Sequence, residues 1–275
     1  MLTSYKSDLK PFEELARSFA LRELAGKTEE HDRYPFGGFF YSVLDKAYEV
    51  GLLGVMLPEN LGGIGGDIGT LCAILDAVCR VDSSLGGIIF TNALSQEIML
   101  AAGAGEQAGS IFRQASSVGE LLVAYPSYVR PAHQDDLPHA SRSGRGYVLT
   151  GKIELLVLGG LAQKALIPAK AGAGPSFSFF LVDLDQEGIL KSEPVFTLGL
   201  HSCPAVDLGL SSVKARLVGE EGKGQAYFEQ ISPKMHVASA AMNAGIMKGS
   251  FDEALSYSRE RFQGGREIIG WSEVS

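Results

Sequence analysis

The spacing of apolar residues changes twice along the chain, and this double change constrains the fold more than any single motif. Apolar residues recur every three or four positions as far as Ser117, short apolar or β-branched runs follow until Val213, and helical spacing returns at Pro233. A period near 3.6 marks amphipathic helices, and short runs bounded by turn residues mark strands. The sequence therefore predicts an α+β protein in three parts: an all-α domain (1–118), an antiparallel β barrel or sandwich (119–224) and a further helical segment (225–275).

Five helices with short connections are expected in the first part, which is typical of an all-α domain. Gly26 and Gly51 follow two of the apolar patterns and would end those helices as C-terminal caps. Ser83 or Ser84 can cap the fourth helix. The expected helices cover 12–24, 39–50, 67–80, a segment from Ser83 or Ser84 to Ala102, and a shorter segment to about Ala115.

Six short runs in the middle part have the composition of strands. They are rich in apolar or β-branched residues, and Gly, Pro, Asp and Ser separate them. This spacing favours a small antiparallel barrel or sandwich. The expected strands cover 121–125, 147–150, 153–158, 164–169, 177–182 and 205–213.

The charge of the chain excludes two classes of partner. Its formal net charge is -8, and no run of Lys or Arg exceeds a few residues. Binding to nucleic acid or to an anionic membrane needs a basic surface that releases counterions. Neither nucleic acid nor a membrane is therefore expected as a partner.

Three further features indicate a cytoplasmic location. The first residues lack the apolar core of a signal peptide, and no stretch of 18 apolar residues could span a membrane. The cysteines Cys72, Cys79 and Cys203 are odd in number and lack C-x-x-C spacing. They are interpreted as free thiols in a reducing compartment.

Two other patterns are interpreted structurally. The glycine-rich loop 62–66 follows a helix and has no lysine, so a tight turn is favoured over a phosphate cradle. The five histidines have no partner four residues away and no cysteine neighbour at ligand spacing. No metal site is predicted.

Several short segments occur in the order found in one known family, and together they cover nearly the whole chain. They are LPENLGGIG (57–65), RVDSS (80–84), GYVLTGKI (146–153), LGL (198–200), GEEGKG (219–224) and DEALSYSRER (252–261). In this order the chain resembles the acyl-CoA dehydrogenases. The resemblance implies a helical domain, a β domain and a C-terminal four-helix bundle, with FAD bound between the β domain and the bundle. It also implies that residues 225–275 are the truncated first part of this bundle.

The resemblance also implies a reaction. Family members oxidise an acyl-CoA thioester to its 2,3-enoyl form, and a carboxylate base removes the α-proton while FAD accepts hydride from the β-carbon. Most members carry this base in later bundle helices that this chain lacks. A minority carry it on the first bundle helix, one residue before an arginine, where this chain has Met235 and His236. No catalytic residue is therefore assigned, and His236 is a candidate substrate-binding residue.

Candidate FAD-binding positions follow from the same resemblance. Tyr128 or Val129 stands where the family has a hydroxyl-bearing threonine, Leu155 replaces an aromatic residue, and Val157 replaces a second threonine. Loss of these polar contacts would weaken FAD binding. The last two candidates, which match positions that reach the FAD of a neighbouring subunit, are Arg261 and Gln263.

Two hypotheses follow for function. The first is an FAD-dependent acyl-CoA dehydrogenase of fatty acid metabolism that passes electrons to an electron-transfer flavoprotein. The second is a catalytically inactive, flavin-poor subunit or scaffold that pairs with an active partner. In both cases a homo- or hetero-oligomer is expected, because the apolar face of the last helix needs a cover.

Overall fold

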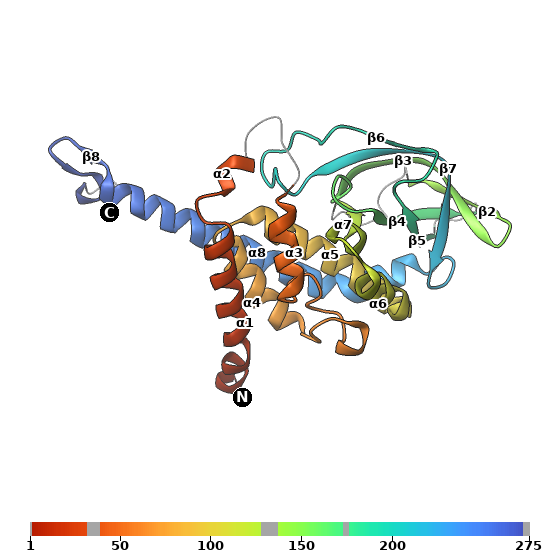
Figure 1. Ribbon diagram of the computed structural model, residues 1–275, viewed down its shortest axis with the longest axis horizontal. Coiled ribbons are helices and arrows are strands. Elements are labelled where there is room, and N and C mark those ends of the chain that lie inside the picture. Colours follow the sequence, from red (N-terminus) through yellow and green to blue (C-terminus); the bar gives the residue numbers. More distant parts are fainter. Residues whose placement is uncertain (1, 32–38, 128–136, 173–175, 272–275) are drawn as a thin grey trace.

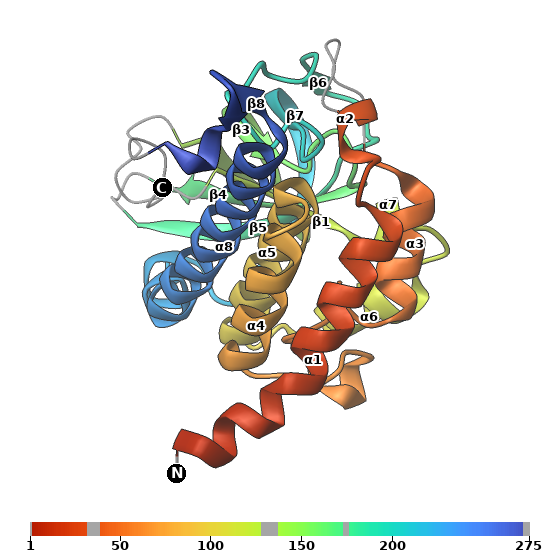
Figure 2. The same cartoon turned by 90° about the vertical axis from the view of Figure 1, so that its left-hand side faces the viewer.

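The computed structural model of the chain describes residues 2–31, 39–127, 137–172 and 176–271. Helices form the first part, and Figure 1 shows them beside the strands of the second. Figure 2 shows α1, α4, α5 and the long helix α8 side by side in one layer, with the strands above it. The helices are α1 (Leu2–Glu23), α2 (Thr28–His31), α3 (Tyr41–Glu49), α4 (Ile68–Cys79), α5 (Ser83–Ala101), α6 (Gly105–Gln114), α7 (Val118–Leu121) and α8 (Gly224–Glu260), and a 3₁₀ turn, η1, covers Glu59–Leu61.

Aspartate side chains begin the two central helices. At α4, Asp67 accepts a hydrogen bond from the backbone N–H of Thr70 at 2.9 Å, as expected for an N-cap. At α5 the cap is Asp82, which accepts from Leu85 N–H at 2.6 Å, and this corrects the expected serine cap. An aspartate one residue earlier adds a favourable charge at the positive end of the helix.

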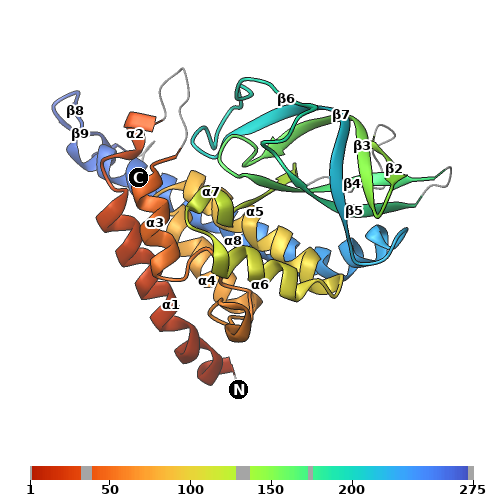
Figure 3. The ribbon, with the colours of Figure 1, turned by 45° about the vertical axis from the view of Figure 1, so that its right-hand side comes forward.

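The strands form one sheet that closes on itself. The order is β1-β3-β2-β4-β5-β7-β6, and additional β1–β4 and β3–β7 pairings complete the barrel visible in Figure 3. The β1–β4 and β2–β4 pairs are parallel, which corrects the expectation of a purely antiparallel sheet. The strands are β1 (Val123–Pro126), β2 (His139–Ser143), β3 (Gly146–Val157), β4 (Lys164–Ala171), β5 (Phe177–Asp183), β6 (Ile189–Lys191) and β7 (Ala205–Val218).

Some strands differ from the expected runs. The two runs predicted over 147–150 and 153–158 belong to the single strand β3, whose pairing with β7 shifts register twice. These shifts accommodate extra residues without ending the strand. Strands β2 and β6 had no counterpart in the prediction.

Helix α8 begins nine residues before Pro233, which was expected to mark its start, and this corrects the prediction. Apolar residues on both sides of the proline, Phe228 and Met235 among them, are buried and hold the helix continuous. After the helix, a small hairpin (β8, Phe262–Gln263; β9, Arg266–Glu267) precedes the 3₁₀ turn η3 (Ile268–Gly270).

The α+β class predicted from the sequence is confirmed, whereas the domain boundaries at 118/119 and 224/225 stay a prediction. The thiols of Cys72, Cys79 and Cys203 are free, as expected. Over the described ranges, no helix combines the length and apolarity needed to cross a membrane.

Candidate functional site

A largely apolar cavity of about 350 Å³ lies where the sheet meets α5 and α8. This is at the lower end of the range of about 300–1,000 Å³ found for small-ligand sites. Four segments line it: α5, the β1 and β3 ends, the loop before β7, and α8. The lining residues are Gly87, Phe90, Thr91, Leu94, Tyr125, Pro126, Ser127, Leu155, Val157, Thr197, Gly199, Leu200, Cys203, Ala205, Ser239, Met242, Asn243 and Ile246.

Helix α5 forms one wall, and hydrogen bonds on its other side fix its rotation. Its cavity-lining residues recur at helical spacing of three or four, so they share one face. On the other side, the amides of Asn92 and Gln96 donate to the carbonyl of Leu53 at 2.9 and 3.1 Å, and the hydroxyl of Ser95 donates to that of Val123 at 3.0 Å. These buried bonds keep the apolar face directed at the cavity.

The sheet wall contains an unusual backbone conformation at Leu155. Its φ of 52° lies in the left-handed region, which costs a non-glycine residue about 1–2 kcal/mol. The backbone N–H of Leu155 donates to Asp207 Oδ1 at 2.9 Å, and its carbonyl accepts from the N–H of Ser127 at 2.8 Å. Both backbone groups are therefore occupied, and the side chain lines the cavity beside Val157.

A turn that is held by hydrogen bonds among its own residues closes the third side of the cavity. The hydroxyl of Thr197 donates to the carbonyl of Gly199 at 2.8 Å, and Nε2 of His201 lies 2.8 Å from the carbonyl of Thr197. Helix α8 supplies the fourth side through residues spaced three or four apart, from Ser239 to Ile246.

The lining carries no charged side chain over the described residues. Its polar groups are hydroxyls and an amide, and desolvation by burial, with a smaller effect of Asp82, raises the pKa of Cys203 to about 12, so this thiol is neutral. The nearby carboxylate of Glu97 is buried and pairs with Lys234 on α8 at 3.1 Å rather than lining the cavity. The site can enclose an apolar chain or ring and hold an uncharged polar group; no carboxylate in the lining could act as a base.

The structure brings together only some of the predicted site residues. Leu155 and Val157 both line the cavity, whereas His236 is exposed on α8 and is not part of the lining. Arg261 and Gln263 are exposed at the hairpin that Figure 1 shows at the far end of α8. Tyr128 and Val129 lie outside the described residues.

Four polar lining residues had no signal in the sequence analysis. Thr197 and Ser127 lie in irregular segments without a motif. Ser239 and Asn243 flank the buried Met242 on α8, so the phase of the buried apolar residues could have identified them.

The side chains of this lining suit one part of FAD and not the other. Leu155 and Val157 contribute apolar side chains suited to the flat faces of a flavin ring, and Ser127 contributes a hydroxyl to the same lining. The pyrophosphate has no cationic partner in the described lining. The residues present therefore fit the ring system, and they do not account for the rest of the dinucleotide.

Comparisons with known proteins identify sequences and a fold similar to those of this chain. The family model described as "Acyl-CoA dehydrogenase, N-terminal domain" matches residues 6–117. The caffeyl-CoA reductase-Etf complex subunit CarC of Acetobacterium woodii is 28% identical, over 97% of this chain and 72% of that protein. Cyclohex-1-ene-1-carbonyl-CoA dehydrogenase of Syntrophus aciditrophicus is 26% identical, over 93% of this chain and 63% of that protein.

A solved structure shows the same fold. Butyryl-CoA dehydrogenase of Megasphaera elsdenii superposes with a TM-score of 0.82 at 20% identity, over 97% of this chain and 72% of that one. The fold is an α+β arrangement with a largely apolar cavity between its sheet and its helices. Together, the match over residues 6–117, the relatives and the shared fold support membership of the acyl-CoA dehydrogenase family.

Proposed function

We propose that the chain provides the acyl- and flavin-facing walls of an FAD-dependent acyl-CoA dehydrogenase. The observation that supports this is the uncharged cavity between the sheet and helices α5 and α8. An apolar site of this kind suits the acyl group of a thioester. The names of the two relatives describe a reductase and a dehydrogenase, so the reaction class is hydride transfer at the α,β bond of an acyl-CoA.

The walls of the cavity would have different tasks. Phe90, Leu94 and Met242 would enclose the acyl chain, while Leu155 and Val157 would contact the flavin ring. FAD, when bound, supplies the two-electron acceptor that the reaction needs. Removal of the α-proton needs a base, and no described lining residue is a carboxylate. We therefore propose that this chain alone binds a thioester without turning it over.

The uncharged lining also supports a second candidate: an inactive, flavin-poor subunit that pairs with an active partner. Met235, at one family base position, is fully buried, and His236 is exposed outside the lining. A subunit of this kind could retain the fold while its partner performs the chemistry.

The proposed electron partner follows from the resemblance to the family, and the proposed cellular location follows from the thiols. The name of CarC places that protein in a complex with Etf, and we propose an electron-transfer flavoprotein as the electron partner of the assembled enzyme. The free thiols support a cytoplasmic location.

The test is a pair of binding titrations with the purified chain. Butyryl-CoA should shift the NMR amide resonances of α5 in the wild type and in the control variant Ala240→Phe. Ser239→Phe, which fills the cavity, should weaken binding by at least about tenfold. Equal binding by both variants would contradict the proposed acyl site.

Flavin content separates the two candidates. Substantial FAD bound by the chain, with a spectrum that butyryl-CoA perturbs, would favour the dehydrogenase. Thioester binding with no FAD uptake would favour the flavin-poor subunit. Turnover by the chain alone with an artificial acceptor would contradict the assignment of no base.

A further inference from the structure

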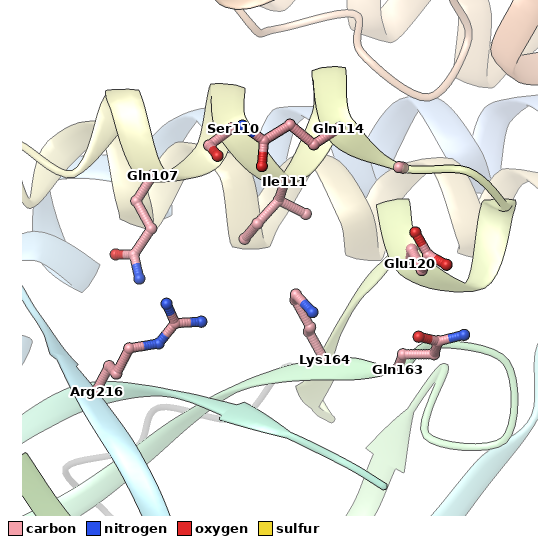
Figure 4. Close-up of a pocket in the computed structure, with 9 residues that line it drawn as sticks. Gln107, Ser110, Ile111, Gln114, Glu120, Gln163, Lys164 and Arg216 are labelled. Carbon is pink, nitrogen blue, oxygen red and sulfur yellow. The ribbon is translucent and has the colours of Figure 1, made fainter.

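A second, polar cleft lies on the other side of the contact between helices and sheet. Its volume is about 410 Å³, and Figure 4 shows it between α6 above and strands β4 and β7 below. An adjoining hollow of about 570 Å³ shares Gln163, Lys164 and Arg216 with it. None of its lining residues belongs to the apolar cavity, so the cleft is separate from the proposed acyl site.

One face of α6 supplies the upper wall. Gln107, Ser110, Ile111 and Gln114 are spaced at three and four, so they lie on the same side of the helix. The opposite side of α6 carries the buried Phe112 and packs into the core. Three of these four cleft-facing residues therefore present an amide or a hydroxyl to the space.

The lower wall presents two cations. Figure 4 shows the guanidinium of Arg216 on β7 and the ammonium of Lys164 on β4 directed into the same space, and strand β5 separates these two strands in the sheet. The ammonium of Lys164 lies 3.1 Å from Asp183 Oδ1. Over the described residues, no ion pair or side-chain hydrogen bond engages Arg216.

The acidic groups around the cleft leave this guanidinium without an acceptor. Glu120, the carboxylate of the cleft itself, accepts from the N–H of Ser116 at 2.9 Å and from its hydroxyl at 2.8 Å. These bonds, with a smaller effect of Lys164, lower the pKa of Glu120. In the adjoining hollow, Asp183 pairs with Lys164, and the lining also includes Asp185 and the further cation Lys214.

We propose that this cleft binds a small oxyanion, a phosphate or carboxylate group, between Arg216 and Lys164. The fork of guanidinium N–H groups matches two oxygens of either anion, and the ammonium adds a point charge. Figure 4 shows the amide of Gln107 directed toward the guanidinium of Arg216, where it would add a donor for the remaining oxygens. A cleft with two cations and one engaged carboxylate is a local exception on a chain whose net charge is -8.

The experiment is a titration of the full chain with inorganic phosphate and with succinate at constant ionic strength, followed by amide resonances. Shifts should concentrate on α6 and on residues near 164 and 216. Arg216→Gln should weaken binding by about tenfold or more, and Arg216→Lys should retain part of it, because a point charge remains without the fork. Arg145→Gln, which removes an exposed arginine of the β2–β3 turn, should leave affinity within about twofold.

Each outcome decides the proposal. Saturable shifts that Arg216→Gln removes support it, and the tighter of the two probes identifies the ligand as a phosphate or a carboxylate. Identical shifts with chloride, or equal losses in the Arg145 and Arg216 variants, overturn it. The readout does not depend on flavin or thioester, so its failure leaves the proposed acyl site untouched.

Discussion

At Ser212, a left-handed backbone conformation marks a β-bulge in β7. Leu149 pairs with Val213 and Gly151 with Leu210, so Thr150 alone opposes two residues of β7. The φ of Ser212 is 55°, and its exposed side chain has no packing to lose. The N–H of Ser212 donates to the hydroxyl of Thr150 at 3.2 Å, which holds the bulge in register.

We expect Ser212→Gly to stabilise the protein. Glycine removes the cost of the left-handed conformation, about 1–2 kcal/mol, and loses part of that gain to the greater entropy of its unfolded chain. The net increase in the free energy of unfolding should be about 0.5–1 kcal/mol by urea denaturation. Ser211→Gly is the matched control, since Ser211 has no positive φ, and it should destabilise. A loss of stability in both variants would show that the bulge is unstrained.

Helices α4 and α8 approach each other at two glycines. A Cβ at Gly245 would lie 2.5 Å from the carbonyl oxygen of Asp76, and one at Gly249 would lie 2.3 Å from that of Arg80. Ion pairs flank this contact: Lys248 binds Asp76 at 2.7 Å, and Arg80 binds Asp252 at 2.6 Å. The absence of side chains therefore sets the distance between the two helices.

We expect Gly245→Ala to lower the free energy of unfolding by about 1–3 kcal/mol, because the added methyl group meets backbone that cannot move aside. This loss should exceed the gain in helix propensity, about 1 kcal/mol. Thermal and urea denaturation measure the difference. Ser250→Ala, on the exposed side of the same helix, should change stability by less than about 0.5 kcal/mol. An unchanged Gly245 variant would mean that the two helices can separate freely.

The turn before α8 is tied to the β2–β3 hairpin through Glu221. Its carboxylate accepts from the hydroxyl of Tyr147 and, at 2.8 Å, from the guanidinium of Arg142. Tyr147 first, and then Arg142, hold the pKa of Glu221 below its ordinary value of 4.5. The folded state therefore favours the ionised carboxylate.

Because the folded pKa is lowered, the stabilisation from Glu221 is fully present above pH 4.5 and is lost as the pH falls through the folded value. Glu221→Gln should lower Tm at neutral pH and make Tm less sensitive to acid below 4.5. Glu220 is a neighbouring exposed carboxylate, and Glu220→Gln should leave the dependence of Tm on pH near that of the wild type. A parallel acid profile in the Glu221 variant would contradict the assigned pKa shift.

How far the sequence predicts each element depends on whether its signal is local. Helix α4 was predicted because its apolar period lies within its own residues, while β2 and β6 are recognisable only through their pairing with β3 and β7. Leu155 and Val157 were named through the resemblance as candidate FAD-binding residues, which stays a prediction, and both line the cavity. Thr197 and Ser239 were not, because the fold brings their distant segments together.

On the scale of the whole molecule, α8 contacts both the helical layer and the sheet. It starts beside β5, packs against α5 and α4 in its middle, and extends beyond both toward the hairpin (Figure 1). One side is buried through residues such as Met235 and Met242, while the opposite side is open. The large apolar residues exposed on it are Val237 (56%), Met247 (66%), Phe251 (65%) and Tyr257 (58%).

We expect the purified chain to associate through this open face of α8, because association would remove its exposed large apolar side chains from water. At about 25 cal/mol per Å² of apolar surface, covering a few hundred Å² contributes several kcal/mol before the cost of association is subtracted. Light scattering should therefore give a mass above that of one chain. The double variant Met247→Asp with Phe251→Asp should shift the mass to that of a monomer, whereas Ser250→Asp should not. A wild-type chain that stays monomeric, with α8 amides exchanging as slowly as those of α5, would contradict this prediction.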